Sequence, residues 1–182
     1  MQSKSEPLSI AQLGEPVLRQ VASSVLRFNC ADLDAFIEQL LAKMLESNGV
    51  GIAAPQVHVS KQIMIIASRP NARYPDAPEM TPLVMINPQI IKSGHPEIIE
   101  KDWEGCLSIP GIRAKVPRAT NVKVVFMDRY GAELQREFTG FLARIFLHEY
   151  DHLIGLSYLD RVEDNKDIVS ETYYLTHIVK KP

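Results

Sequence analysis

The chain has 182 residues, of which 46% are hydrophobic and 23% are charged, and its formal net charge is −2. This length fits one globular domain, the hydrophobic fraction excludes a disordered chain, and the small net charge argues against a dedicated nucleic-acid-binding protein. With only two cysteines, Cys30 and Cys106, the chain is not a disulfide-stapled scaffold and fits a reducing compartment.

The first residues carry no recognisable targeting signal. Residues 1–10 lack the long apolar stretch of a secretory signal. The longest apolar runs, such as residues 63–67, are far too short to span a membrane. We therefore expect a cytoplasmic protein that does not associate with a membrane.

The first regular element is predicted to be an amphipathic helix. Residues 7–28 are expected to be irregular, with a turn at residues 14–16. Asp32 is a suitable N-cap, and apolar residues then repeat at intervals of three and four as far as Leu45. Asn48 and Gly49 end the pattern. The apolar face of this helix is expected to pack on a sheet.

Strands are predicted to dominate the middle of the chain. The apolar run at residues 62–68 indicates a buried strand, whereas four prolines make residues 69–82 a loop. Further strands are expected at residues 83–91, 97–103, 122–128 and 133–138, the last two joined by a turn at residues 129–132.

A second helix is expected to begin near Thr139 or Gly140 and to continue past His152. Residues 168–179 fit a helix or a strand equally well. Strands that follow one another, with two separate helices, predict an α+β fold of mostly antiparallel sheets. We expect the sheets to pack around the second helix, with the first helix near the N-terminus.

The second predicted helix contains the most informative motif, His-Glu-Tyr-Asp-His at residues 148–152. Residues four apart lie on one face of a helix, so His148 and His152 can bind one metal ion. Glu149 lies beside them, where it can act on a metal-bound water. A surface helix with two solvated histidines is the alternative. Apolar residues before the motif disfavour it, because they predict a half-buried helix.

A catalytic metal needs a third protein ligand. The long protease pattern H-E-x-x-H-x-x-G-x-x-H fits at Gly155, but Tyr158 occupies the position of its third histidine. Cys106, in the turn-like segment at residues 104–110, is the other candidate and would leave one position open for water. A buried structural thiol is an equally good interpretation of Cys106 from its position alone.

A third segment of interest is Gly-Val-Gly-Ile-Ala-Ala-Pro-Gln at residues 49–56. Its small residues permit close approach of a backbone or substrate, and Gln56 is a neutral donor that could polarise a carbonyl. By itself, the segment is more simply interpreted as the end of a helix followed by a loop.

Together, the three segments resemble the motifs of the peptide deformylase family. Residues 49–56 match G-φ-G-φ-A-A-P-Q, where φ is apolar, and residues 104–108 match E-G-C-L-S. Residues 148–152 match the third motif, Q-H-E-x-D-H, except that Leu147 occupies the glutamine position. The resemblance implies one catalytic domain over residues 1–182. Its implied activity is removal of the formyl group, as formate, from the N-terminal formyl-methionine of newly made polypeptides.

The resemblance also implies a metal site and a mechanism. Cys106, His148 and His152 would hold Fe(II), which Ni, Co or Zn can replace, although ligand type alone suggests zinc. Metal-bound hydroxide would attack the formyl carbon. Three residues would act directly in catalysis: Glu149 as general base and then acid, and the Gln56 amide and Leu107 N–H as oxyanion donors.

Substrate binding is implied in the same way. The methionine side chain and the substrate backbone would be bound by Val50, Gly51, Gly105, Phe141 and Ile145, together with His148. The expected partners are N-formyl-methionyl nascent peptides and, transiently, the ribosome, without direct recognition of nucleic acid.

Several alternatives stay open at this point. Glu104 and Arg113 either form an ion pair that braces the cysteine segment or are two solvated charges. Asp151 either supports a histidine ligand or stabilises the helix. The competing functions are an H-E-x-x-H metallopeptidase and a deformylase-like protein that binds peptide or metal without catalysis.

Overall fold

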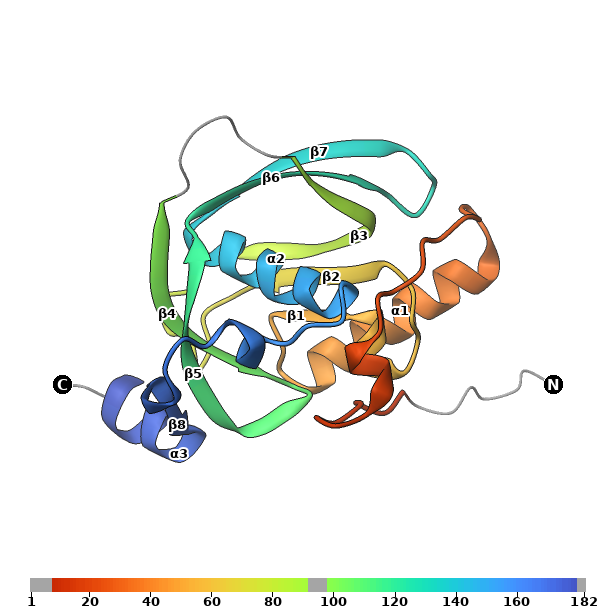
Figure 1. Ribbon diagram of the computed structural model, residues 1–182. Helices are drawn as coiled ribbons and strands as arrows, with labels where there is room; N and C mark the ends of the chain where they lie inside the picture. Colours follow the sequence, from red (N-terminus) through yellow and green to blue (C-terminus); the bar gives the residue numbers. More distant parts are fainter. Residues whose placement is uncertain (1–7, 92–97, 180–182) are drawn as a thin grey trace.

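The computed structural model describes residues 8–91 and 98–179 (Figure 1). Two antiparallel sheets lie on either side of helix α2 (Gly140–Leu153). The five-stranded sheet has the order β1 (Gly51–Ala53), β2 (Ile63–Ser68), β3 (Met80–Ile91), β6 (Asn121–Met127), β7 (Glu133–Thr139). The three-stranded sheet has the order β4 (Ile99–Cys106), β5 (Ile109–Ala119), β8 (Ile168–Ser170). This arrangement confirms the predicted α+β class.

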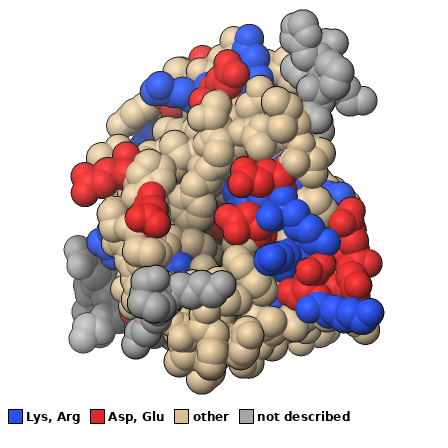
Figure 2. Space-filling model, turned by 90° about the vertical axis from the view of Figure 1, so that its left-hand side faces the viewer, with Lys and Arg blue, Asp and Glu red and all other residues tan. Residues whose placement is uncertain are grey.

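Short helical turns connect and follow the strands. They are η1 (Pro16–Arg19), η2 (Ala54–Val57), η3 (Tyr158–Arg161), η4 (Asn165–Asp167), α3 (Glu171–Tyr173) and the π-helical η5 (Tyr174–Val179). The segment that fitted helix or strand is therefore mostly helical, after the short strand β8. None of the described helices is long and apolar enough to cross a membrane. On the described part of the face in Figure 2, acidic and basic side chains are interleaved.

Helix α1 (Ala31–Glu46) begins one residue before the predicted N-cap. Cys30 is the N-cap, and Asp32 lies in the first turn, where a negative charge is favourable at the positive end of the helix dipole. The apolar face buries Ile37 and Leu40 against residues of β1 and β2, as predicted. The helix ends at Glu46, just before the predicted stop.

Helix α2 is buried because its two sides contact different parts of the fold. Ala143, Phe146 and Leu153 pack into the apolar core with residues of the five-stranded sheet. The opposite side presents charged and histidine side chains toward the end of β4. Helical periodicity thus lets one element support the core and carry polar groups.

The bounds of β3 and β4 differ from the predicted ones by two or three residues, and one long strand was not predicted. Strand β3 begins at Met80, inside the predicted loop, and includes Pro82. Proline is tolerated there because β3 pairs only with β2 at that point, and β6 joins from Ile86 onward. The strand predicted from Glu97 runs from Ile99 to Cys106, and residue 97 itself lies outside the described residues. Strand β5 escaped prediction because its prolines and glycine interrupt the alternating pattern.

Candidate active site

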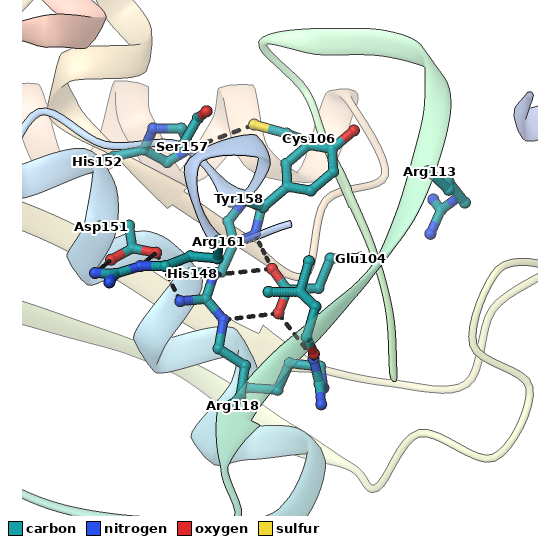
Figure 3. Close-up of polar contacts among 12 residues, drawn as sticks. Glu104, Cys106, Arg113, Arg118, His148, Asp151, His152, Ser157, Tyr158 and Arg161 are labelled. Atoms are coloured by element: carbon teal, nitrogen blue, oxygen red, sulfur yellow. Dashed lines mark hydrogen bonds and ion pairs between the residues drawn. The ribbon is translucent and has the colours of Figure 1, made fainter. Parts of the chain in front are cut away.

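The histidines of α2 meet the cysteine at the end of β4. The ligand atoms of Cys106, His148 and His152 all lie within 4.8 Å of one another, and Cys106 Sγ is 3.3 Å from His152 Nε2 (Figure 3). One sulfur and two imidazole nitrogens form a donor set that suits a divalent transition metal, so these residues fit a metal ion.

A hairpin irregularity places the cysteine. Cys106 pairs with Ile109 across a two-residue turn, and the register of β4 with β5 shifts between Glu104 and Cys106. Such a shift re-aims a side chain relative to a regular strand. Gly105 fits at this point because a Cβ there would approach the Arg113 guanidinium carbon to 3.0 Å.

The Cys106 thiol lies in an environment that favours its ionised form. Burial alone would raise the pKa of Cys106, but the charge of His152 and hydrogen bonds to both histidines lower it to about 5. The thiolate is the form that binds a metal. The electrostatics of this cluster therefore agree with its donor chemistry.

Glu104 supports His148 from behind the cluster. Its carboxylate lies 2.9 Å from His148 Nδ1 and accepts two hydrogen bonds from Arg118, at 2.8 and 3.0 Å, and one from Arg144 at 3.0 Å (Figure 3). Burial would raise the pKa of Glu104, but the hydrogen bonds from His148 and Arg118 outweigh it and lower the pKa to about 2. An ionised carboxylate only accepts, so Nδ1 donates and Nε2 of His148 is left for a metal.

The ion pair considered between Glu104 and Arg113 is absent from the structure. The Arg113 guanidinium instead bonds to the Tyr74 hydroxyl at 3.0 Å and to Glu171 at 3.2 Å, and it also lies over the ring of Tyr174. The pairing was not predictable because these aromatic and acidic partners are far from Arg113 in the sequence.

Asp151 joins the same charged network without touching a histidine ligand. It accepts a bond from Arg118 at 2.6 Å and one from Arg161 at 2.7 Å. Asp151 therefore acts on His148 only through Arg118 and Glu104. This arrangement favours its interpretation as a support of the helix.

A pocket opens beside this cluster. It is lined by Asn48, Gly49, Val50, Gly51, Gln56, Arg73, Tyr74, Trp103, Glu104, Gly105, Cys106, Leu107, Phe141, Arg144, Ile145, His148 and Glu149. All residues predicted for the site lie on this pocket except His152, which is buried at 1% exposure beside Cys106. The structure thus brings together all three sequence segments that were singled out.

The side-chain amide of Gln56 is held in one orientation. Its Oε1 accepts the Ala53 N–H at 2.9 Å, which turns Nε2 toward Cys106 Sγ at 3.4 Å and Ser108 Oγ at 3.3 Å. A fixed N–H donor therefore lies next to the potential metal ligand.

Glu149 is a buried carboxyl with a free oxygen. Among the described residues its Oε2 has no hydrogen-bond partner, and burial is the main cause that raises its pKa to about 7. A carboxyl with a pKa near neutrality can both take and return a proton. Gly51 leaves room for it, because a Cβ at that position would overlap the carboxylate.

Among the aromatic residues that line the pocket, Phe141 was predicted from the sequence, whereas Tyr74 and Trp103 were not. The Tyr74 ring packs at a tilt of 52° against Phe141 with ring centroids 4.8 Å apart, and the Trp103 ring packs at a tilt of 59° against Tyr174 at 5.5 Å. Tyr74 comes from the proline-rich loop, whose position depends on distant partners. Arg144 is a further pocket residue that was not predicted. Its position could have indicated it, because Arg144 lies four residues before His148 on the same helix face.

The chain is similar to known proteins along most of its length. A family model described as polypeptide deformylase matches residues 7–167. A protein named peptide deformylase 2 from Nostoc sp. is 49% identical over 175 residues, covering 96% of this chain and 97% of that protein. A peptide deformylase 2 from Shewanella oneidensis is 48% identical over 160 residues, covering 88% of this chain and 87% of that protein.

Solved structures show the same similarity. The class I type b peptide deformylase from Acinetobacter baumannii, with Met-Ala-Ser bound, is 45% identical with a TM-score of 0.80. The match covers 85% of this chain and 98% of that one. A peptide deformylase from Synechococcus elongatus in complex with actinonin is 38% identical with a TM-score of 0.77, covering 88% of this chain and 81% of that one.

Proposed function

The chain belongs to the peptide deformylase family, and on that premise we propose how its single domain performs the reaction. The proposed reaction is hydrolysis of the N-formyl group of formyl-methionyl nascent peptides, with release of formate. The observation that carries this proposal is the meeting of Cys106, His148 and His152 beside a pocket that also presents Glu149 and Gln56.

We propose that Cys106, His148 and His152 hold a divalent metal, Fe(II) in the cell. When bound, this ion would supply Lewis-acid chemistry and a nucleophile near neutral pH. Glu104 prepares His148 for this role because it fixes the Nδ1–H tautomer. The low pKa of the Cys106 thiol also favours metal binding, since it presents the sulfur as thiolate.

Attack on the formyl carbon creates negative charge on its oxygen, and donors set in advance stabilise that charge. The Gln56 amide is one donor, because its Nε2 is already turned toward Cys106 by the bond from Ala53. The backbone N–H of Leu107, in the turn that follows Cys106, is the second. Both lie on the walls of the pocket.

Glu149 carries the proton. Its raised pKa, about 7, lets the carboxylate accept a proton from the attacking water and then deliver it to the leaving amine. The delivery matters because, without this proton, the nitrogen would have to leave as an amide anion, which is a very poor leaving group. The unpartnered Oε2 is the atom we assign to this transfer.

The pocket selects the substrate. Val50, Phe141 and Ile145 provide an apolar wall for the methionine side chain. Gly51 and Gly105 lie on edge strands of the two sheets and can offer backbone groups to an extended peptide, as an added strand would. The Acinetobacter relative with Met-Ala-Ser bound supports this assignment. We further propose that the protein works in the cytoplasm, in transient contact with the ribosome.

The test is formate release from the formylated peptide formyl-Met-Ala-Ser, with Met-Ala-Ser as the control substrate. Anaerobically purified protein should release one formate per formylated peptide, and it should leave the control peptide intact. Cleavage of internal peptide bonds without formate would show a peptidase instead. Metal binding without turnover would show a non-catalytic protein.

The ligand set is tested separately by elemental analysis. Cys106→Ala should abolish stoichiometric metal. Cys30→Ala is the matched control, because Cys30 is the N-cap of α1 and lies outside the pocket. Unchanged metal content in Cys106→Ala would refute the ligand assignment.

A further inference from the structure

The first described segment of the chain, residues 8–15, lies across two parts of the active site, and we call it the N-terminal strap. It forms no helix or strand. The backbone N–H of Ala11 donates to the Gln56 carbonyl at 2.8 Å, and the N–H of Leu13 donates to the Ser108 carbonyl at 2.9 Å. Glu15 adds a side-chain contact at 3.2 Å to His58, the residue that follows η2.

The two segments that the strap joins are distant in sequence. Gln56 lies on η2, and Ser108 lies in the turn between β4 and β5. Their side chains also meet, since Gln56 Nε2 lies 3.3 Å from Ser108 Oγ. The strap therefore connects the backbones of the same two segments that this side-chain contact connects.

Both carbonyl-bearing residues are buried, Gln56 at 1% and Ser108 at 0% exposure. A buried carbonyl that loses its donor is costly, so the two backbone hydrogen bonds are strong constraints on position. The turn held by Leu13 also contains Leu107, whose N–H is the second oxyanion donor. The strap thus fixes the segments that carry both donors.

We propose that the N-terminal strap positions the oxyanion donors, with Ala11 and Leu13 as positioning residues that act through their backbone N–H groups. This inference rests on the proposed function, in which Gln56 and the Leu107 N–H stabilise the developing charge. Donors of this kind work because they are placed in advance, and small displacements of catalytic groups reduce rates steeply.

Leu13→Pro is the variant that isolates the strap. Residues 12–15 form a turn closed by the Glu15 N–H on the Gln12 carbonyl at 3.0 Å, with Gly14 at φ +105° in the third position. A positive φ there is typical of a type II turn, whose second position favours proline. Proline at residue 13 therefore suits the backbone but removes the N–H donor. Leu13→Ala is the matched control, because it keeps the donor and the side chain is half exposed.

We expect Leu13→Pro to lower kcat for formyl-Met-Ala-Ser by about tenfold, with KM and bound metal within about twofold of the parent. Leu13→Ala should match the parent. In a Gln56→Ala background, the additional loss from Leu13→Pro should shrink, because the two changes act on the same donor set. A role in stability alone would not produce this non-additivity.

Three outcomes would overturn the inference: an unchanged kcat in Leu13→Pro, an equal loss in the presence and absence of Gln56, or a loss that only parallels released metal. Should Leu13→Pro fail to fold, replacement of Leu13 by its α-hydroxy acid in a semisynthetic chain ligated at Cys30 removes the N–H and keeps the side chain. Formate release by the parent tests the proposed function by itself. If the parent releases formate and Leu13→Pro has an unchanged kcat, only the inference about the strap is contradicted.

Discussion

The Glu104 carboxylate lies 2.9 Å from Nδ1 of His148 and is itself buried at 3% exposure. Because Arg118 and Arg144 also bond to this carboxylate, it stays ionised and holds the imidazole in one tautomer. The orientation of His148, a potential metal ligand on α2, therefore depends on a residue of β4 in the three-stranded sheet.

Replacement of this carboxylate tests its effect on metal binding. Glu104→Gln should weaken metal affinity by about 10–100-fold, since a neutral amide no longer fixes the His148 tautomer. Asp151→Asn is the control, because Asp151 bonds to Arg118 but to neither histidine. Competition with a chelator measures both. Equal losses in the two variants would assign the effect to the network as a whole.

Glu104 should also make the metal-free protein sensitive to acid. Its pKa is about 2 when folded, below the ordinary value of 4.5, so its stabilisation is fully present above pH 4.5. This contribution, on the order of 3 kcal/mol, is lost as the pH falls toward 2. Urea unfolding at several pH values should show a weaker acid dependence in Glu104→Gln. The exposed change Glu46→Gln should leave the parent profile intact, and identical profiles for all three proteins would contradict the prediction.

Proton transfer is tested at Glu149. Glu149→Gln keeps the shape of the side chain but removes the group that titrates near pH 7. We expect the variant to retain metal and to lose at least about a hundredfold in kcat for formate release. The exposed variant Glu163→Gln should match the parent. Activity of Glu149→Gln within about tenfold of the parent would show that another group moves the proton.

The close approach of Gly51 to Glu149 leads to a further prediction. Gly51→Ala places a methyl group where the carboxylate lies, so kcat should fall by about tenfold or more while metal content is retained. Gly131→Ala is the comparison, because Gly131 has φ +86° in the β6–β7 turn and its neighbour is Phe28. That change should reduce the free energy of unfolding without changing kcat. Parent-like kinetics in Gly51→Ala would mean that the carboxylate moves aside freely.

Tyr74 should control substrate affinity more than turnover. Tyr74→Ala removes the ring that packs at a tilt against Phe141 and should raise KM for formyl-Met peptides about tenfold, with kcat within about threefold. Tyr74→Phe keeps this ring contact but loses the hydrogen bond from Arg113 to the hydroxyl, so its KM should lie between those of the parent and Tyr74→Ala. Steady-state kinetics measure both constants. A change in kcat alone in Tyr74→Ala would contradict a role of Tyr74 in substrate binding.

The local parts of the fold were predictable from sequence because the signals were local. The periodicity that ends at Leu45 identified α1, and the repeat before His148 identified α2. Residues four apart on α2 also predicted that His148 and His152 would lie together, as they do. Cys106 could be placed beside them only through the family resemblance, since its position depends on the β4–β5 hairpin.

The features that escaped prediction depend on long-range packing. Arg113 meets Tyr74, Glu171 and Tyr174 only after the loop, β5 and the C-terminal helices have come together. The early start of β3 also depends on long-range packing. Pro82 is acceptable in this strand because β6 pairs with β3 only from Ile86 onward. No pattern of propensities within a short window contains this information.

The location of the three potential ligands has a thermodynamic consequence. Cys106 belongs to the three-stranded sheet, whereas both histidines belong to the helix whose other side packs on the five-stranded sheet. An ion held by all three would act as a cross-link between the two halves of the molecule. Since the unfolded chain offers no such preformed cluster, binding would be linked to folding and would add about 3 kcal/mol of stability at a metal concentration one hundred times the dissociation constant.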